Sequence, residues 1–260
     1  MGDRRTQILE QVIARQRVDV GELADQFAVS RVTVRKDLDH LEERGLVRRQ
    51  HGYAEAIAPD DLRSRLAFHY DVKRRIAAAA AGLVPHGATV MIESGSCCAL
   101  LAEEVGNTRR GVTIITNSAF IADHVRTSQA SVVLLGGDYQ PQSQVLVGPL
   151  VEQGAASFFV DRLFIGIDGY TEADGFTGGN HLRAAAVRAM AQRAREVVVL
   201  TESLKFPRQG AVPLLPLTAV SQVVTDSDLP PAMLAHLTDA GVTVTTVPAV
   251  SANPTSREDN

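Results

Sequence analysis

The sequence predicts an α/β protein in two parts, a small helical module followed by a larger domain built around a mainly parallel sheet. Two patterns carry this prediction. The first 57 residues contain three short helical segments and a basic hairpin, whereas seven short β-branched runs alternate with helical segments from residue 88 onward. Such strands are continuous apolar runs because helices cover both faces of the sheet.

Length and charge limit the class of protein. The 260 residues are 45% hydrophobic with a net charge of -4, which allows one large domain or two unequal ones. No apolar run approaches the roughly 18 to 20 residues that span a bilayer, and charges stand where a signal peptide needs an apolar core, so we expect a cytoplasmic protein. The net charge argues against coating nucleic acid along the whole surface, but it leaves room for one small DNA-reading module.

Three helices are expected in the N-terminal part. Apolar positions recur at helical spacing over residues 4–17, and the second segment, VGELADQFAV, follows a break at Val18-Asp19. Ser30 offers an N-cap for a third helix, SRVTVRKDLDHLEERG, in which apolar residues at i, i+4 and i+7 define a buried face. Gly45 is expected to close this helix.

The exposed face of the third helix gathers cations at its N-terminal end. Because the helix dipole favours acids there, we expect these cations to face an external polyanion. The next segment, LVRRQHGYAEAI, is typical of a basic β-hairpin wing. A solvated charged face would explain the cations alone, but helices and wing together favour a DNA-binding winged helix-turn-helix. The candidate DNA-contacting residues are Ser30, Arg31, Thr33, Arg35 and Lys36 in the helix, and Arg48, Arg49 and His51 in the wing.

The remaining chain divides by composition. We expect residues 1–57 to form the helix-turn-helix domain, 58–70 a partly helical linker, 71–250 the second domain and 251–260 a loose polar tail. Asp71 is expected to cap the helix VKRRIAAAAAGLV. The predicted strands are ATVMI at 88–92, VTIIT at 112–116, SVVLL at 131–135, DRLFIGI at 161–167, EVVVL at 196–200, SQVVT at 221–225 and VTVTTV at 242–247.

Small polar residues follow five of these strands. Ligands of parallel sheets bind beyond the carboxyl ends of the strands. One such loop is often an ordinary turn, but five in succession indicate a site for a phosphate or a polyol. The first also precedes a helix whose N–H groups can receive an anion. The loops are Glu93-Ser94-Gly95-Ser96, Thr116-Asn117-Ser118, Gly136-Gly137-Asp138, Asp168-Gly169 and Thr201-Glu202-Ser203.

Single residues near these loops leave alternatives open. Lys205 supplies a point cation suited to a phosphate or carboxylate, or is a solvated surface lysine. Asp168 and Asp174 can accept sugar hydroxyls or shape their own turns. The adjacent Cys97 and Cys98 lack metal-ligand spacing; they either fill a tight turn or provide a redox-sensitive thiol at a helix N-terminus. We expect no metal and no cofactor.

In these motifs the chain resembles the DeoR family of bacterial sugar-metabolism regulators over nearly its whole length. The N-terminal part is similar to the family's helix-turn-helix signature in GELADQFAVSRVTVRKDLDHLEERGLVRRQHG. The C-terminal part is similar to its sensor domain in KRRIA, ESGS, TNS, LLGG, LVGP, DGFT and LKF. The resemblance implies a Rossmann-like sensor related to ribose-5-phosphate isomerase and CoA-transferase folds, which binds a phosphorylated sugar and thereby relieves repression of a catabolic operon.

The resemblance also implies a set of effector-binding residues and three departures from the family pattern. Tyr53 stands in HGYA where HGGA is common, Glu93 stands where Asp is usual, and TESLKF places Glu202 where many members have a D-x-SK-F pattern. The two glutamates would change the size of the pocket. The implied effector-binding residues are Glu93, Ser94, Gly95, Ser96, Asn117, Ser118, Gly136, Gly137, Asp168 and Lys205.

The leading functional hypothesis is a DNA-binding repressor, a homo-oligomeric dimer or tetramer that binds operator DNA and a phosphorylated sugar and no membrane. The linker is the expected transmitter between the two sites. The rival is an isomerase or transferase of sugar phosphates, with Glu93, Asp168, Asp174 or Glu202 as the base. An enzyme gains nothing from a fused DNA-reading module, so we expect no catalytic residues. A third alternative is a DNA-binding protein whose degenerate sensor controls oligomerisation alone.

Overall fold

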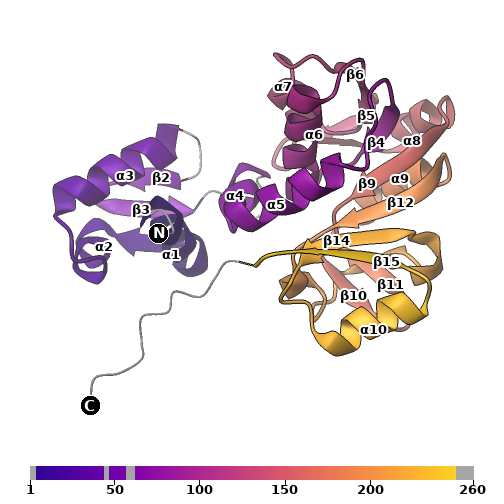
Figure 1. Ribbon diagram of the computed structural model, residues 1–260. Helices are drawn as coiled ribbons and strands as arrows, with labels where there is room; N and C mark the ends of the chain where they lie inside the picture. Colours follow the sequence, from indigo (N-terminus) through magenta and orange to yellow (C-terminus); the bar gives the residue numbers. More distant parts are fainter. Residues whose placement is uncertain (1–3, 44–46, 57–61, 250–260) are drawn as a thin grey trace.

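The computed structural model describes residues 4–43, 47–56 and 62–249, which form a small N-terminal module beside a larger α/β domain (Figure 1). Within these residues, no helix is both long and apolar enough to cross a membrane. The module and the domain have separate hydrophobic cores. The two-part α/β architecture expected from the sequence is therefore confirmed.

The N-terminal module is a winged helix-turn-helix. Its helices are α1 (Arg4–Arg15), α2 (Val20–Gln26) and α3 (Arg31–Glu43), and its antiparallel sheet contains β1 (Arg17–Asp19), β2 (Val47–Gln50) and β3 (Tyr53–Ala56) in the order β1-β3-β2. The break expected at Val18-Asp19 is itself the short strand β1. The predicted wing is confirmed as the hairpin β2–β3, whose two-residue loop, His51-Gly52, has positive φ angles of 48° and 88°. Positive φ at both positions is typical of a type I′ turn.

Helix α3 is fixed at its start and on its buried face. Ser30 Oγ accepts a hydrogen bond from Thr33 N at 3.1 Å, which confirms the predicted N-cap. The side chain of Leu38 is fully buried. Asp37, 5% exposed, accepts hydrogen bonds from Arg4 Nε at 2.7 Å and from Arg5 Nε at 3.2 Å, so two arginines of α1 set the orientation of α3. Gly45, the expected helix end, lies outside the described residues.

Two helices precede the main sheet, α4 (Leu62–Ala67) and α5 (Tyr70–Ala81). Leu62 and Leu66 are buried in the core of the larger domain, so α4 packs there although it lies within the predicted linker. The expectation that Asp71 caps α5 is wrong. The helix begins at Tyr70, two residues before the expected start, and its N-cap is His69, which has a φ of 50° and makes no capping side-chain bond. Asp71 stands exposed in the first turn, where its charge still favours the helix dipole.

All seven predicted strands form one parallel sheet in the order β15-β14-β12-β9-β4-β5-β6. The chain runs outward from β4 to β6 and then returns to place β9 on the other side of β4. The crevice between β4 and β9 is therefore the topological switch point, where ligands of such sheets bind. The strands are β4 (Thr89–Ile92), β5 (Thr113–Thr116), β6 (Ser131–Leu134), β9 (Val160–Ile165), β12 (Ala194–Leu200), β14 (Gln222–Asp226) and β15 (Thr243–Val247).

Helices cover both faces of this sheet. Neighbouring residues Met91 and Ile92 of β4 point into different hydrophobic clusters, as the two-residue period of a strand requires. Helices α4 to α7 contribute to the cluster that contains Ile92, and α8 to α10 to the one that contains Met91. The helices that follow α5 are α6 (Ser96–Thr108), α7 (Ala119–His124), α8 (Pro149–Ala156), α9 (His181–Ala191) and α10 (Pro231–Asp239).

Small antiparallel sheets, which the sequence did not predict, lie outside the main sheet. One is a hairpin of two strands and the other has three strands in the order β10-β11-β13. Two 3-10 turns, η1 (Ser203–Lys205) and η2 (Leu217–Ala219), complete the described elements. The strands are β7 (Asp138–Gln140), β8 (Val145–Val147), β10 (Gly169–Thr171), β11 (Gly175–Gly178) and β13 (Val212–Leu215).

The separate cores generate a prediction about unfolding. Replacing the buried Leu38 by Ala should destabilise the N-terminal module by about 3 kcal/mol, because the substitution leaves a cavity in its core. In scanning calorimetry we expect the transition of the module to move to lower temperature while that of the larger domain stays in place. Phe164→Ala, in the core of the larger domain, should show the reverse. A shift of both transitions by either substitution would contradict the independence of the cores.

Candidate functional site

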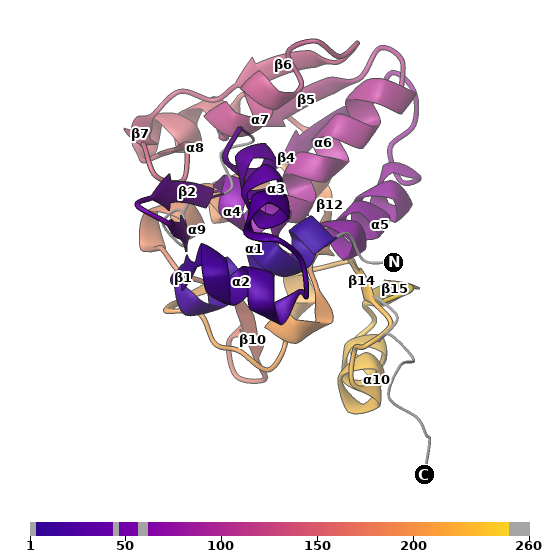
Figure 2. The same cartoon turned by 90° about the vertical axis from the view of Figure 1, so that its left-hand side faces the viewer.

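The N-terminal half of α3 presents an exposed, basic face. The side chains of Arg31, Arg35 and Lys36 are exposed, on the side away from the buried Val34 and Leu38. Figure 2 views the molecule from the side of the module, with α2 and α3 in front of the larger domain. The three predicted helix cations are thus brought together on an accessible surface.

The two hydroxyl residues predicted on this face bond to each other. Ser30 Oγ and Thr33 Oγ1 are 2.8 Å apart. Val32, which we did not select from the sequence, is 61% exposed between the cations. An exposed branched apolar side chain at the start of a recognition helix can contact a thymine methyl group. The sequence gave no signal for Val32, because exposure of one apolar position does not alter helical periodicity.

The wing residues divide into two groups. Arg48 and His51 are exposed. Arg49 is instead joined to α3: its guanidinium pairs with Asp39, and its backbone N–H donates to Glu42 Oε1 at 2.8 Å. Arg49 therefore fixes the wing against α3. The unusual Tyr53 lies under Arg17 of β1, whose guanidinium carbon is 4.1 Å from the ring centroid, so it stabilises the contact between wing and β1.

A cavity of about 390 Å³ opens at the switch point of the larger domain. Its wall combines the first residues after β4 with Gly166, Ile167 and Asp168 after β9, and with segments that precede α9 and follow β12. Helices α4 and α5 add Arg65 and Lys73. Five residues that we selected from the sequence lie in this wall: Glu93, Gly95, Ser96, Asp168 and Lys205.

Five other selected residues do not line this cavity: Ser94, Asn117, Ser118, Gly136 and Gly137. Their described contacts are local. Asn117 Nδ2 donates to the carbonyl of Leu146 at 3.0 Å, and Ser118 Oγ accepts from Ile121 N at 3.2 Å, which caps α7. A Cβ on Gly137, whose φ is 152°, would stand 2.5 Å from the carbonyl oxygen of Val147. These loops organise the hairpin β7–β8, and their proposed part in effector binding stays a prediction.

Glu93 joins the loops on the two sides of the crevice. It is 8% exposed; its Oε1 accepts a hydrogen bond from Ser94 Oγ at 2.7 Å and its Oε2 one from Gly166 N at 3.2 Å. Lys205 Nζ lies 3.8 Å from Asp168 Oδ1, and Asp168 Oδ2 accepts from Gly179 N at 2.8 Å. Lys205 therefore faces Asp168, and Glu93 shapes the crevice.

Asp174 belongs to a turn. Its N–H donates to Thr171 Oγ1 at 3.0 Å, and the residue does not line the cavity. Of the two alternatives left open for Asp174, the structure favours turn chemistry.

The N-terminus of α6 faces the cavity without a side-chain cap. Gly95 is its N-cap residue and makes no capping side-chain bond. Gly95, Ser96 and Cys97 all lie in the cavity wall. Because the first N–H groups of a helix have no partner within the helix, this end of α6 is suited to receive an anion.

A buried ion pair joins α5 to the loop after β12. Lys73 Nζ is 3.3 Å from Glu202 Oε2, both residues are at most 4% exposed, and Lys73 also donates to the carbonyls of Arg65 and Phe68. His69 Nδ1 lies 2.7 Å from Glu202 Oε1. Burial lowers the pKa of Lys73, with Glu202 opposing the shift. Burial alone would raise the pKa of Glu202, but His69 and Lys73 together hold it below its usual value.

Basic side chains outnumber acidic ones around the cavity. Sequence reasoning missed most of them, although Lys73 lies in the quoted KRRIA motif. Arg65 and Arg183 come from helices, where no strand-end pattern marks a site. The basic residues in the wall are Arg65, Lys73, Arg183, Lys205 and Arg208, and the acidic ones are Glu93, Asp168 and Glu202.

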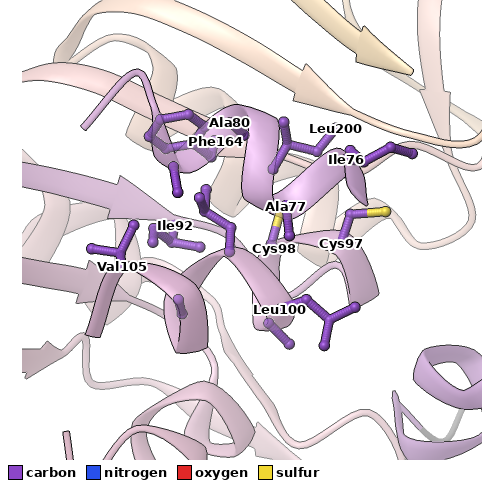
Figure 3. Packing of buried hydrophobic residues seen from close by; sticks show 14 of the residues in the cluster. Ile76, Ala77, Ala80, Ile92, Cys97, Cys98, Leu100, Val105, Phe164 and Leu200 are labelled. Atoms are coloured by element: carbon purple, nitrogen blue, oxygen red, sulfur yellow. The ribbon is translucent and has the colours of Figure 1, made fainter. Parts of the chain in front are cut away.

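The two cysteines are core residues. Cys97 and Cys98 are buried, and they pack among Ile76, Ala77 and Leu100 (Figure 3). Burial raises the pKa of Cys97 to about 12 and also raises the pKa of Cys98. A thiol with so high a pKa carries almost no reactive thiolate near neutral pH, which favours packing over a redox role. In the described part of the chain, no three His, Cys, Asp or Glu side chains gather as a metal site.

The fold and the cavity define a class of protein: a winged helix-turn-helix joined to an α/β domain with an anion-suited pocket at its switch point. The model of the DeoR C terminal sensor domain matches residues 68–227, and that of the DeoR-like helix-turn-helix domain matches residues 4–60. The chain belongs to the DeoR family of transcriptional regulators.

Two relatives in sequence agree with this assignment. The chain is 29% identical to a putative aga operon transcriptional repressor of Escherichia coli O157:H7, over 93% of this chain and 92% of the relative. It is 27% identical to the glycerol-3-phosphate regulon repressor of Escherichia coli K12, over 91% and 95%. Among solved structures, ribose 5-phosphate isomerase A from Methanocaldococcus jannaschii aligns with a TM-score of 0.40 and 22% identity, over 53% of this chain and 55% of that one.

The buried pair generates a prediction about pH. Glu202→Gln should destabilise the protein near neutral pH by about 3 kcal/mol, because Lys73 then loses its counter-charge. The pKa of Glu202 is lower in the folded state than its usual 4.5, so its stabilising contribution is complete above that pH and is lost as pH falls through the folded-state value. The difference in free energy of unfolding between wild type and variant, measured with denaturant, should therefore become smaller in acid. Glu152→Gln, at an exposed position on α8, is the control. A difference in free energy of unfolding that stays constant into the acid range would show that Glu202 does not titrate in this way.

Proposed function

We propose that this regulator is a repressor of a carbohydrate-catabolism operon and that a phosphorylated sugar or sugar acid in the cavity releases it from operator DNA. The observation that carries the proposal is the surplus of basic side chains in the wall of a cavity that the uncapped N-terminus of α6 also lines. A volume of about 390 Å³ lies within the range of small-molecule sites. The names of the relatives, repressors of the aga operon and the glycerol-3-phosphate regulon, support the same function.

In the proposed complex, α3 enters the major groove. Arg31, Arg35 and Lys36 then face bases or phosphates, while Arg48 and His51 of the wing contact the backbone. Val32 meets a thymine methyl group. A homo-oligomer, dimer or tetramer, places two such modules on repeated half-sites.

The acidic residues of the cavity wall argue against the enzyme hypothesis. A general base must hold an available carboxylate or imidazole near the substrate. Both oxygens of Glu93 accept hydrogen bonds from the protein, and Glu202 is paired with His69 and Lys73, which lower its pKa and so weaken it as a base. Asp168 is engaged by Gly179 and Lys205. In this proposal, the acidic residues of the cavity hold its wall together and do not act as catalytic bases.

Removing one cation from α3 tests the DNA face. Arg35→Ala should weaken operator binding by about 1 to 3 kcal/mol without unfolding the protein, because the exposed guanidinium contacts the DNA directly. The measurement is a gel shift at fixed salt on an operator selected from random DNA. Arg126→Ala, an equal change of charge on the far domain, should leave the affinity unchanged. Equal affinity of Arg35→Ala and wild type would refute the assignment.

Removing one cation from the cavity tests the sensor. Lys205→Ala should bind the operator as wild type does but should fail to respond to the effector, because the lysine supplies positive charge to the anion. The effector is first identified by a thermal-shift screen of phosphorylated sugars and sugar acids, since a ligand that binds the folded state raises the midpoint. Release by the same effector concentration in variant and wild type would remove Lys205 from the site.

A further inference from the structure

Helix α4 connects the two halves of the molecule and contributes one side chain to the cavity. It lies between the module and the larger domain (Figure 1). Leu62 and Leu66 anchor it in the core of the larger domain, and Arg65 stands in the cavity wall. The backbone carbonyl of Arg65 also accepts a hydrogen bond from Lys73, so α4 is held to α5 at this residue. The backbone of Arg65 is therefore tied to α5, whereas its side chain is held by no such bond to the described residues at Nε and Nη2.

Two of the three guanidinium nitrogens of Arg65 lack a hydrogen-bond partner among the described residues. Its Nε and Nη2 are shielded from solvent, and neither has a hydrogen-bond partner in the described part of the chain. A guanidinium carries five N–H donors and stays charged at any physiological pH, so burying donors without an acceptor disfavours the folded state. By contrast, Lys73 and Lys205 in the same wall each face a carboxylate. Unpaired donors therefore lower the stability of the folded state. Because these donors lie in a cavity wall, they indicate an anionic partner from outside the chain.

Arg65 and the N-terminus of α6 line the same cavity. Helix α4 packs against α6. The side chain of Arg65 therefore comes from a helix that adjoins α6. Gly95 and Ser96, at the start of α6, lie in the same wall. One anionic group can thus meet the uncapped helix end and the guanidinium together.

We propose that Arg65 binds the phosphate or carboxylate group of the effector, so that the ligand itself joins helix α4 to the N-terminus of α6. This inference rests on the proposed function of the cavity. A guanidinium suits the role because it binds phosphate and carboxylate groups through two parallel hydrogen bonds.

The contact has a direct path to the DNA-binding face. Helix α4 contacts α1, and Arg4 and Arg5 of α1 hold Asp37 of α3. An effector that fixes α4 through Arg65 therefore acts on the helix that adjoins the DNA-binding module. Release of DNA follows because the ligand favours the arrangement of α4 in which Arg65 reaches the anion.

The experiment compares Arg65→Met with Arg65→Lys in the full-length protein. Met approximates the length of the side chain without its charge, and Lys restores a charge without the planar fork. Arg126→Met, at an exposed surface pair, is the matched control. Thermal midpoints are measured without ligand and with inorganic phosphate, glycerol 3-phosphate, ribose 5-phosphate and fructose 6-phosphate, with fructose as the uncharged control. The affinity of wild type is then measured for the phosphate compound that shifts its midpoint most.

Two results together support the proposal. Without ligand, Arg65→Met should melt at the wild-type midpoint or above it, because two shielded N–H donor groups without an acceptor have been removed. Its affinity for the phosphate compound should fall roughly 10- to 100-fold, the loss expected for hydrogen bonds to a charged group, and Arg65→Lys should recover part of it. DNA release by Arg65→Met should require correspondingly more ligand.

Other results overturn it. A ligand-free midpoint below wild type, with or without a ligand shift, would show that Arg65 serves packing. Wild-type affinity in Arg65→Met would remove Arg65 from the site while leaving the proposed function intact. If wild type itself responds to none of the phosphate compounds, the proposed function fails, and the inference about Arg65 fails with it.

Discussion

The buried ion pair between Lys73 and Glu202 holds together the parts of the chain on which function depends. Lys73 reaches back to the carbonyls of Arg65 and Phe68, so it fixes the junction of α4 and α5. Glu202 belongs to the loop after β12 and also bonds to His69 at that junction. Two segments distant in sequence, residues 65–73 and the loop after β12, are thereby joined at the cavity wall. Because removing one partner of a buried pair leaves an uncompensated charge, this corner of the domain has little freedom to rearrange alone.

Joining these segments makes the cavity part of the connection between the two domains. The segment before α5 is both the route to the DNA-binding module and a wall of the pocket. At the other end of this route, Asp37 is held by two arginines of α1, so α3 follows α1. In the proposed complex, a ligand between α4 and α6 acts on a helix that contacts α1 on one side and α5 and α6 on the other. Such contacts can transmit a change of position, whereas a loose tether cannot.

The sheet could be predicted because its strands are buried on both faces. Runs such as TIIT in β5 and VVVL in β12 are apolar without alternation, and all seven runs of this kind became strands of one sheet. The hairpins β7–β8 and β10–β11 could not be predicted, because DYQ, GYT and GFTG contain polar residues or glycine in place of a continuous apolar run, and VLV is only three residues long. The start of α5 was misjudged since His69 occupies a left-handed conformation that no sequence pattern marks.

The site could be predicted in part for a similar reason. Glu93, Gly95 and Asp168 directly follow strands that border the switch point, so their position follows from topology. The loop that contains Asn117 also follows a strand, yet it lies on the β6 side of β4, away from the crevice beside β9. Arg65 and Arg183 reach the cavity from helices, and their meeting depends on tertiary packing that a single sequence does not reveal.

The central claim is that the cavity and the DNA-binding face are thermodynamically linked. The most direct test is calorimetric titration of the identified effector into the free protein and into the protein saturated with operator DNA. Linkage requires that the effector bind the DNA complex more weakly, by the same factor by which the effector weakens DNA binding. That result is the one the structure predicts. Equal effector affinity in the free protein and the complex would contradict the account.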